Sequence, residues 1–355
     1  MNELTERQKV ILTLVIHEYI RSATAVGSNT LVSRYKLDYS SATVRNELAA
    51  LTDMGYLRQP HTSAGRIPSE EGYRYFVSRL IRAGDLPDTN RQTISHQFYQ
   101  IRNDVEQWVR LAASVLARQS RVASLVTSPH PERSRLKHVE LISTRGRQIL
   151  MVLVMVGGEV HQRILLLDEP VSQEQLSQSA NRISQFLQNK DLDDIKARRS
   201  QLNGLDLDIA DWISEDMQQA DAMVAGEVIV DGLTNVLSEP EFTGSDDARK
   251  ALRLLEERTL LQDLVARTNQ TGNQGGVQVL IGGEGNWEEL RQWSIVLGRY
   301  GLPGFATGTL GVLGPLRMSY GRAISTVKFL SGVLSDLVAE TMVDDITTPA
   351  DEVNL

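Results

Sequence analysis

Apolar residues in the first 35 positions recur at helical spacing and predict two helices. The first is expected from Thr5, which can cap it, to Ile20. Its apolar stripe would consist of Ile11, Leu12, Val15, Ile16 and Tyr19. Ser28 is then expected to cap a second, shorter helix over residues 29–35.

The same spacing predicts a third helix with two unlike faces. It would begin after Ser40 or Ser41 and end at Met54, because Gly55 can adopt the left-handed conformation that ends a helix. An apolar face is expected to pack on the first two helices through Val44, Leu48, Leu51 and Met54. The opposite face carries small or hydrogen-bonding side chains, namely Thr43, Arg45, Asn46, Ala49 and Ala50. A helix that enters the major groove needs small residues for close approach, and Arg or Asn to reach base edges.

A hairpin is predicted next, with short strands at 56–60 and 66–68 and a polar tip between them. It holds no acidic residue, and its candidates for contact with the DNA backbone or the minor groove are Arg58, His61, Ser63 and Arg66. Gly65 is expected to need a backbone angle that other residues resist. A further helix, capped by Ser69, would run to about Arg82.

Three helices, a short turn before the third and a hairpin are typical of a winged helix-turn-helix. We expect Arg45 and Asn46 to reach base edges, with Thr43 and Ser41 on nearby phosphates or bases. A small helical domain used for protein contacts is the alternative. The basic hairpin and the acid-poor helix face agree with each other and favour DNA binding.

Charge is unevenly distributed along the 355 residues, whose formal net charge is −8. Residues 1–150 hold 21 Lys and Arg against 14 Asp and Glu, whereas the remaining 205 hold 16 against 31. This pattern suggests that the N-terminal end meets a polyanion and that dimer contacts lie in the acidic body. The absence of cysteine excludes disulfides and thiolate zinc sites. Together with a polar N-terminus and short apolar runs, it predicts a cytoplasmic protein without membrane contact.

Downstream patterns predict a sheet domain interrupted by a helical region. Strands are expected at 138–143, 148–156, 159–168, 277–281 and 309–313. Helices are expected at 89–120, 172–189, 211–225, 246–266, 287–300 and 319–341. The simplest arrangement is one mixed sheet completed from both sides, with residues 192–270 inserted. The apolar seam of the helix at 89–120 could pack on the same chain or on a second subunit.

The run YSSATVRNELAALTDMGYLRQPHTSAGRIPSEEGYRYFV, Tyr39–Val77, closely resembles the N-terminal signature of the HrcA family of heat-inducible transcription repressors. The same resemblance is carried by LTERQKVILTLVIHEYI (Leu4–Ile20), VDGLTNVLSEPEF (Val230–Phe242) and GTLGVLGPLRMSYGRAIS (Gly308–Ser325). It extends over essentially the whole chain in the expected order. Its most specific part is the SAGRIP hairpin followed by GYRYFV.

The resemblance implies an α+β multidomain fold, in which a winged helix-turn-helix precedes a GAF-like mixed sheet domain interrupted by a mostly helical dimerisation insert. The expected parts are a DNA-binding domain at 1–85, a helical linker and the first part of the GAF-like domain at 86–191, the insert at 192–270, the second part at 271–345 and a tail at 346–355. The resemblance also implies that a homodimer binds an inverted-repeat operator, the CIRCE element, upstream of chaperone genes. The GroE chaperonin would keep this repressor active.

Residue types with catalytic or ligating chemistry form no recognisable constellation. The six histidines show no metal-binding spacing, and neither a nucleophile elbow nor a phosphate-binding loop is present, so no enzyme, metal or cofactor is expected. The alternative function is a small-molecule-sensing regulator that uses the GAF-like domain. For the dimer contact, the insert at 192–270 is the first choice and the seam at 89–120 is the second.

Overall fold

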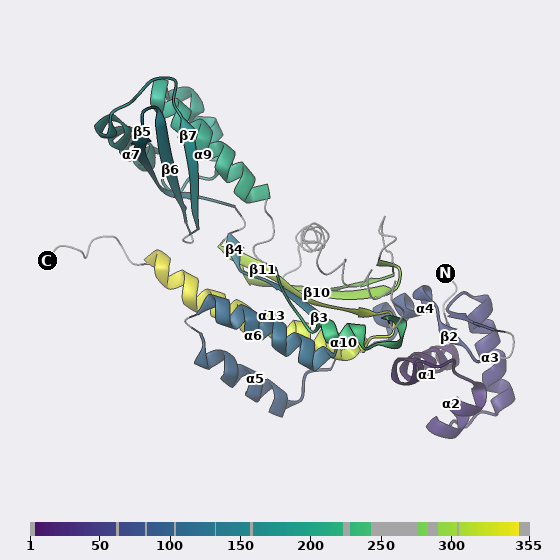
Figure 1. The fold of residues 1–355 in the computed structure, drawn as a ribbon. Coiled ribbons are helices and arrows are strands. Elements are labelled where there is room, and N and C mark those ends of the chain that lie inside the picture. Colours follow the sequence, from purple (N-terminus) through teal and green to yellow (C-terminus); the bar gives the residue numbers. More distant parts are fainter. Residues whose placement is uncertain are drawn as a thin grey trace. The chain divides into compact units, whose positions relative to one another are not determined.

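The computed structural model describes residues 4–61, 64–81, 84–102, 104–131, 133–156, 159–222, 228–242, 276–282, 290–303 and 305–347. The chain forms two compact units (Figure 1). The larger comprises residues 1–128, 227–300 and 309–334, and the smaller comprises residues 129–226, 301–308 and 335–355. In the described part of the chain, no helix combines the length and apolar character needed to cross a membrane.

The larger unit begins with three helices whose starts are set by local capping. They are α1 (Glu6–Ser22), α2 (Ser28–Tyr35) and α3 (Ser41–Asp53). Thr5 caps α1 in a capping box with Gln8, and Ser40 caps α3, as the sequence predicted. The prediction that Ser28 caps α2 is wrong: Gly27 is the N-cap and supplies no side-chain hydrogen bond.

The apolar faces of these helices form one core. Its buried side chains are Ile11, Leu12, Val15 and Ile16 of α1, Leu31 of α2, and Val44, Leu48 and Leu51 of α3. Met54 was expected on this face but is 37% exposed, because α3 ends at Asp53 and Met54 is only its C-cap. Gly55 follows with a φ of 83°, which confirms the predicted helix stop.

A two-stranded hairpin follows, formed by β1 (Leu57–Arg58) and β2 (Ile67–Pro68), with Leu57 paired to Pro68. Ser69 then caps α4 (Glu70–Tyr75), which continues as a single π-helical segment, η1 (Phe76–Leu80). The expected helix after the hairpin is therefore confirmed, with a change of helical pitch near its end.

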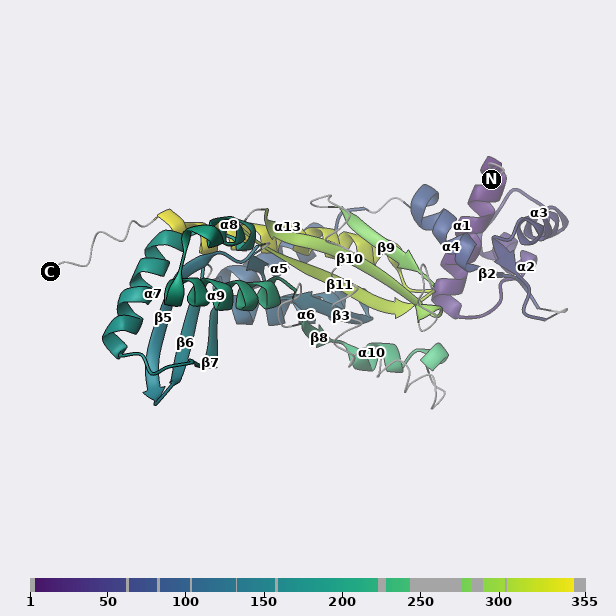
Figure 2. The same cartoon turned by 90° about the horizontal axis from the view of Figure 1, so that it is seen from above.

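A six-stranded antiparallel sheet, most of which lies in the larger unit, forms the body of that unit (Figure 2). Its strands are β3 (Ala123–Thr127), β4 (His130–Pro131), β8 (Val228–Asp231), β9 (Val277–Ile281), β10 (Trp293–Leu302) and β11 (Ala306–Pro315). All of these strands but β4 lie wholly or mainly in the larger unit. They are ordered β8-β3-β11-β10-β9, with β4 pairing beside the start of β11. Every residue of β11 is buried, so this strand is the centre of the core.

Helices α6 (Val105–Ser120) and α13 (Tyr320–Thr347) lie on one face of this sheet, and α5 (Asp88–Gln100) lies beyond α6 (Figure 1). The pattern at 89–120 was expected to be one helix, but it is two, since Asp104 caps α6. The side chains of Trp108, Val115 and Leu116 are fully buried within this single chain. Two short segments follow β8, namely α10 (Leu233–Leu237) and η3 (Pro240–Phe242).

The smaller unit is a three-stranded meander covered on one face by helices. It contains β5 (Leu136–Arg145), β6 (Gln148–Met155), β7 (Val160–Leu166), α7 (Gln173–Leu187), α8 (Leu192–Arg198), η2 (Arg199–Gln201) and α9 (Gly204–Ala222). Alternate strand residues, such as Leu141, Met151 and Leu165, pack with Ile183 of α7 and Ile213 of α9 in a single core.

The prediction of one mixed sheet completed from both sides is wrong. Strands β5, β6 and β7 pair only with one another among the described residues, and β3, β4, β8, β9, β10 and β11 form the six-stranded sheet. The physical reason is that β5, β6 and β7 follow one another directly in the chain and pair locally, while α7 and α9 pack on one face of the sheet they form. A domain boundary at residue 192 is likewise wrong, because Ile195 and Ile209 pack in the same core as the meander.

Two further helices were predicted in the C-terminal half. The helix expected at 287–300 is wrong for its described residues, since Trp293 begins β10. Its apolar run carries β-branched residues and pairs with β9, for example Val296 with Val279. The helix expected at 246–266 lies outside the described residues.

Candidate nucleic-acid interface

Helix α3 is anchored so that its exposed face is fixed. Its start is capped by Ser40, whose hydroxyl oxygen accepts a hydrogen bond from the Thr43 amide at 3.1 Å. The buried face formed by Val44, Leu48 and Leu51 leaves Arg45 and Asn46 exposed on the opposite side. Both candidate base-reading residues are therefore accessible on a rigid element.

The two hydroxyl residues expected beside them are held in contacts within the protein. Ser41 donates to the side-chain oxygen of Asn29, and its hydroxyl lies 3.0 Å from that of Ser28. The hydroxyl of Thr43 lies 2.9 Å from that of Ser40. These bonds join the beginnings of α2 and α3, so Ser41 and Thr43 order the turn between the helices.

Negative charge next to Arg45 and Asn46 is offset by a neighbouring helix. Glu47 is half-buried, and its carboxylate accepts a bond from Arg7 of α1 at 3.3 Å. The guanidinium of Arg7 also lies 5.0 Å from the centre of the Tyr39 ring. Glu47 thus presents little unbalanced charge to a polyanion, and the other acidic residue of α3, Asp53, is exposed at the last position of the helix.

The hairpin exposes two of its predicted contact residues. Arg58 projects from β1, and His61 begins a turn in which its carbonyl accepts the Ala64 amide at 2.8 Å. The Gln59 side chain closes the same turn by donating to the Ala64 carbonyl at 3.0 Å. Ser63 lies outside the described residues.

Arg66 lies at the base of the hairpin, and its contacts are structural as well as electrostatic. Its backbone exchanges two hydrogen bonds of 2.8 Å with Val26, and its Nε donates to the Thr52 hydroxyl at 2.9 Å. The side chain is consequently half-buried against α3. Arg66 fastens the hairpin to the segment before α2 and to the end of α3.

Gly65 is required for space and not for an unusual backbone angle, so the expectation about its conformation is wrong. Its φ is outside the left-handed region. A Cβ placed on it would lie 2.4 Å from the carbonyl oxygen and 2.8 Å from the amide nitrogen of Val26. The close backbone approach of the Val26–Arg66 bridge therefore excludes a side chain at position 65.

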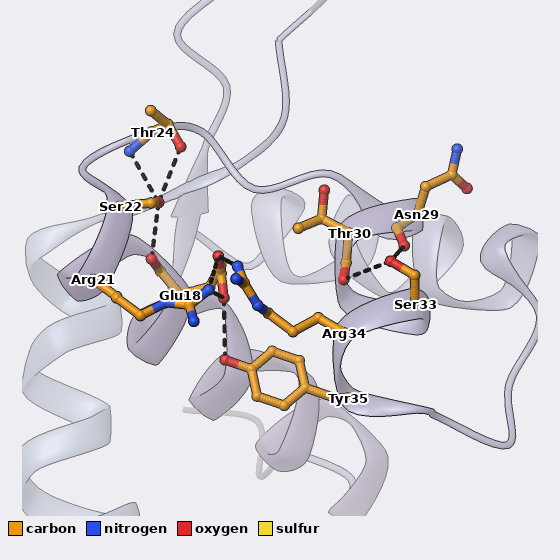
Figure 3. Close-up of polar contacts among 9 residues, drawn as sticks. All are labelled: Glu18, Arg21, Ser22, Thr24, Asn29, Thr30, Ser33, Arg34 and Tyr35. Atoms are coloured by element: carbon orange, nitrogen blue, oxygen red, sulfur yellow. Dashed lines mark hydrogen bonds and ion pairs between the residues drawn. The ribbon is translucent and has the colours of Figure 1, made fainter.

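A buried carboxylate, missed by sequence reasoning, locks α1 to α2 (Figure 3). Glu18 accepts two bonds of 2.7 Å from Arg21, one of 2.6 Å from Arg34 and one of 3.2 Å from the Tyr35 hydroxyl. Burial, followed by the charge and hydrogen bond of Glu18, raises the pKa of Tyr35. A signal was present, because Glu18 falls three residues after Val15 and therefore on the apolar stripe.

Replacing both Arg21 and Arg34 with Ala should lower the free energy of local unfolding of α1 and α2 by about 2–3 kcal/mol, because Glu18 would stay buried with Tyr35 alone. The loss is expected to be smaller than for a fully buried ion pair, because the side chains of Arg21 and Arg34 are 52% and 47% exposed and solvent screens their charges. Hydrogen exchange of the α1 and α2 amides in the full chain measures it. Arg21→Ala alone, which keeps Arg34 on Glu18, is the control with a smaller effect; unchanged protection in the double variant would contradict the prediction.

A packed helix that exposes arginine and asparagine beside an arginine- and histidine-bearing hairpin is the arrangement of a DNA-binding transcription regulator. Over residues 106–324, the chain matches the family described as HrcA protein C terminal domain. It is 43% identical over 346 residues to the heat-inducible transcription repressor HrcA of Roseiflexus castenholzii, with 95% of each chain covered. The protein of the same name from Herpetosiphon aurantiacus is 43% identical over 345 residues, covering 95% of this chain and 96% of that one. The chain belongs to the HrcA family, and it is a heat-inducible transcription repressor, not an enzyme.

A solved structure supports the fold over the same length. A crystal structure described only as that of a hypothetical protein superposes with a TM-score of 0.56. It is 22% identical and covers 95% of this chain and 98% of its own. The α+β arrangement of helices and antiparallel sheets is thus found in an experimentally solved protein.

Proposed function

We propose that residues 4–81 form a winged helix-turn-helix that binds an inverted-repeat operator of the CIRCE type. Helix α3 would enter the major groove, with the β1–β2 hairpin as a wing along the backbone. The observation that carries the proposal is the exposure of Arg45 and Asn46 on a helix whose other face is fully packed. Small neighbours on that helix, such as Ala42 and Ala49, permit close approach to the bases.

The residues of this interface would divide into two roles. Arg45 and Asn46 would read base edges, with Ser41 and Thr43 holding the turn before them and contacting nearby phosphates. On the wing, Arg58, His61, Ser63 and Arg66 would contact the backbone or the minor groove, with Gly65 allowing the wing to dock.

Arg45→Ala should reduce the ratio of operator to random-DNA affinity by about 5- to 100-fold, since a good base contact contributes about 1–3 kcal/mol of discrimination. Competition binding with full-length protein on both duplexes measures the ratio. Arg110→Ala is the control, because Arg110 is exposed on α6 and paired with Glu106. If Arg45 only clamps a phosphate, binding will weaken equally on all sequences and the ratio will not change.

We further propose that the repressor forms a homodimer in which two copies contact each other through the face of the three-stranded sheet that helices α7 and α9 do not cover. This face is defined by Ile142, Leu150, Val152, Val154, Val160, Ile164 and Leu166. Ile142 pairs with Leu150, which pairs with Ile164, so the apolar side chains form a continuous row across the three strands. Ile164 is 64% and Leu166 is 68% exposed in the single chain.

A second copy of the chain is the partner that we expect to bind this face. An antiparallel sheet with helices on one side usually shows polar residues on the other, whereas this open face carries an exposed apolar row beside polar residues such as His138, Glu140 and Gln162. An inverted repeat requires two recognition helices related by a two-fold axis, which a self-complementary face provides. The apolar seam on α6 was the second candidate for the dimer contact. It packs on the sheet of the same chain, since Trp108 and Leu116 are fully buried within one chain.

The larger sheet with α6 and α13 is our candidate for the GAF-like domain. We also propose that the GroE chaperonin modulates the repressor, and the support for this is family membership. A gel shift of the operator with and without the chaperonin tests it.

A further inference from the structure

One side chain, Arg317, joins parts of the chain that sequence reasoning left without a role. It lies in the stretch Gly308–Ser325, between β11 and α13, and its side chain is only 11% exposed. Its guanidinium contacts Glu239 and Glu241, which follow α10, and the backbone of Ile20 near the end of α1. Three of the stretches singled out in the sequence therefore converge here.

The contacts use every nitrogen atom of the guanidinium group. Nε donates to one carboxylate oxygen of Glu241 at 2.6 Å, and Nη2 donates to the other at 3.1 Å. Nη2 also donates to Glu239, and Nη1 donates to the Ile20 carbonyl at 3.3 Å. A planar fork is needed for this two-point pairing, and the single ammonium group of lysine cannot reproduce it.

The contact with Ile20 is what extends the cluster to the DNA-binding helices. Ile20 lies in the last turn of α1, where carbonyl groups lack an intrahelical partner and a positive charge is favourable. Burial alone would lower the pKa of Arg317, but the bonds and charges of Glu241 and Glu239 raise it, so the group stays charged. Helix α1 in turn packs on α3 through its buried face, which includes Ile11 and Val15.

A second set of contacts joins the helix after the hairpin to the same sheet. Arg74 of α4 donates to the Ile281 carbonyl of β9 at 2.9 Å. The rings of Tyr73 and Tyr320 lie 5.7 Å apart. Helix α1 shares in these contacts indirectly, because it packs on η1, where the rings of His17 and Phe76 lie 5.6 Å apart. The Arg317–Ile20 bond joins α1 directly to the segment that follows β11.

We propose that Arg317 is a positioning residue for operator binding, which with Glu239 and Glu241 forms a latch between α1 and the larger sheet. Two α3 helices of a dimer can occupy two half-sites together only if each is held at the right place and angle. A loose joint lowers the effective concentration of the second helix at its half-site. The inference rests on the proposed binding of an inverted repeat, and the latch itself does not contact DNA.

The test measures the affinity of full-length wild type and Arg317→Gln for three duplexes. The first is the inverted repeat, and the second is a single half-site. The third is the same repeat with its spacer lengthened by about 5 base pairs, which is half a helical turn. We expect half-site affinity to stay within about twofold, while affinity for the natural repeat falls by about 10- to 100-fold and the preference for natural spacing is lost. Arg322→Gln is the control, because Arg322 is exposed on α13. Wild type that binds the repeat no better than random DNA would contradict the proposed function and not the latch.

A direct measurement of the joint accompanies the binding data. The chain has no cysteine, so spin labels can be placed at Lys36→Cys and Arg110→Cys, both exposed, in chains diluted with unlabelled protein. Wild type should give one narrow distance distribution, and Arg317→Gln a broad one. A narrow distribution with unchanged spacing preference in Arg317→Gln would overturn the proposal.

A milder variant covers the case in which Arg317→Gln does not fold. Glu241→Gln removes one charge of the latch and keeps Glu239. It should weaken the preference for natural spacing and broaden the distance distribution, each by less than Arg317→Gln does. Arg317→Lys should restore only part of the preference. If Glu241→Gln folds and changes neither quantity, the latch has no positioning role.

Discussion

Replacing Ile164 and Leu166 with Asp is expected to leave the full chain folded but monomeric, and to weaken its binding to an inverted repeat by about 100-fold or more. Both side chains point away from the core of the smaller unit and are more than half exposed, so folding should tolerate the change. A dimer formed through this face would have to bury two carboxylates per chain against apolar side chains, without partners. Sedimentation of the free protein and titration of the operator measure the two effects.

A matched control separates the sheet face from charge in general. Gln185→Asp adds a carboxylate to an exposed position of α7, on the helical side of the same unit, and should leave both dimer and affinity unchanged. If the double variant sediments as a tight dimer, the contact lies on another surface of the body. Far-UV circular dichroism verifies that both variants are folded.

Gly65→Val should detach the hairpin from the helices and lower the affinity for the operator by about 100-fold or more, because the wing loses its place beside α3. The added atoms would overlap the backbone of Val26, and backbone cannot move aside as the end of a side chain can. The two hydrogen bonds between Val26 and Arg66 would have to open. The cost in stability is about 2–3 kcal/mol, the range for overpacking together with lost hydrogen bonds.

Gly65→Ala and Gly27→Ala form a matched pair on the two sides of this bridge. A Cβ at Gly27 would meet only the Thr30 hydroxyl oxygen at 3.9 Å, so Gly27→Ala should bind nearly as wild type does. Gly65→Ala already places a Cβ within 2.4 Å of the Val26 oxygen and should show most of the loss. Equal operator affinity for the two variants would mean that the hairpin is not held by this bridge or is not at the DNA.

Local rules explain why the N-terminal elements were predictable. Capping by Thr5, Ser40 and Ser69 involves residues three positions apart, and the stop at Gly55 depends on one backbone angle. The exposed position of Arg45 followed from helical spacing alone. Glu18 shows the limit of such spacing, since its partner Arg34 comes from a different helix.

The sequence by itself determined the family, the order of helices and strands in the first 81 residues, the strand at Val277–Ile281 and the faces of α3, because capping, periodicity and motif order act over a few neighbouring residues. Only the tertiary structure decided that β5–β7 form their own sheet and that the segment from Trp293 is a strand of the other one. It alone brought Arg317 to Ile20, 297 positions away in the chain. Such pairings depend on which distant segments bury the same apolar surface and satisfy the same buried charges, and no periodicity within either segment encodes that choice.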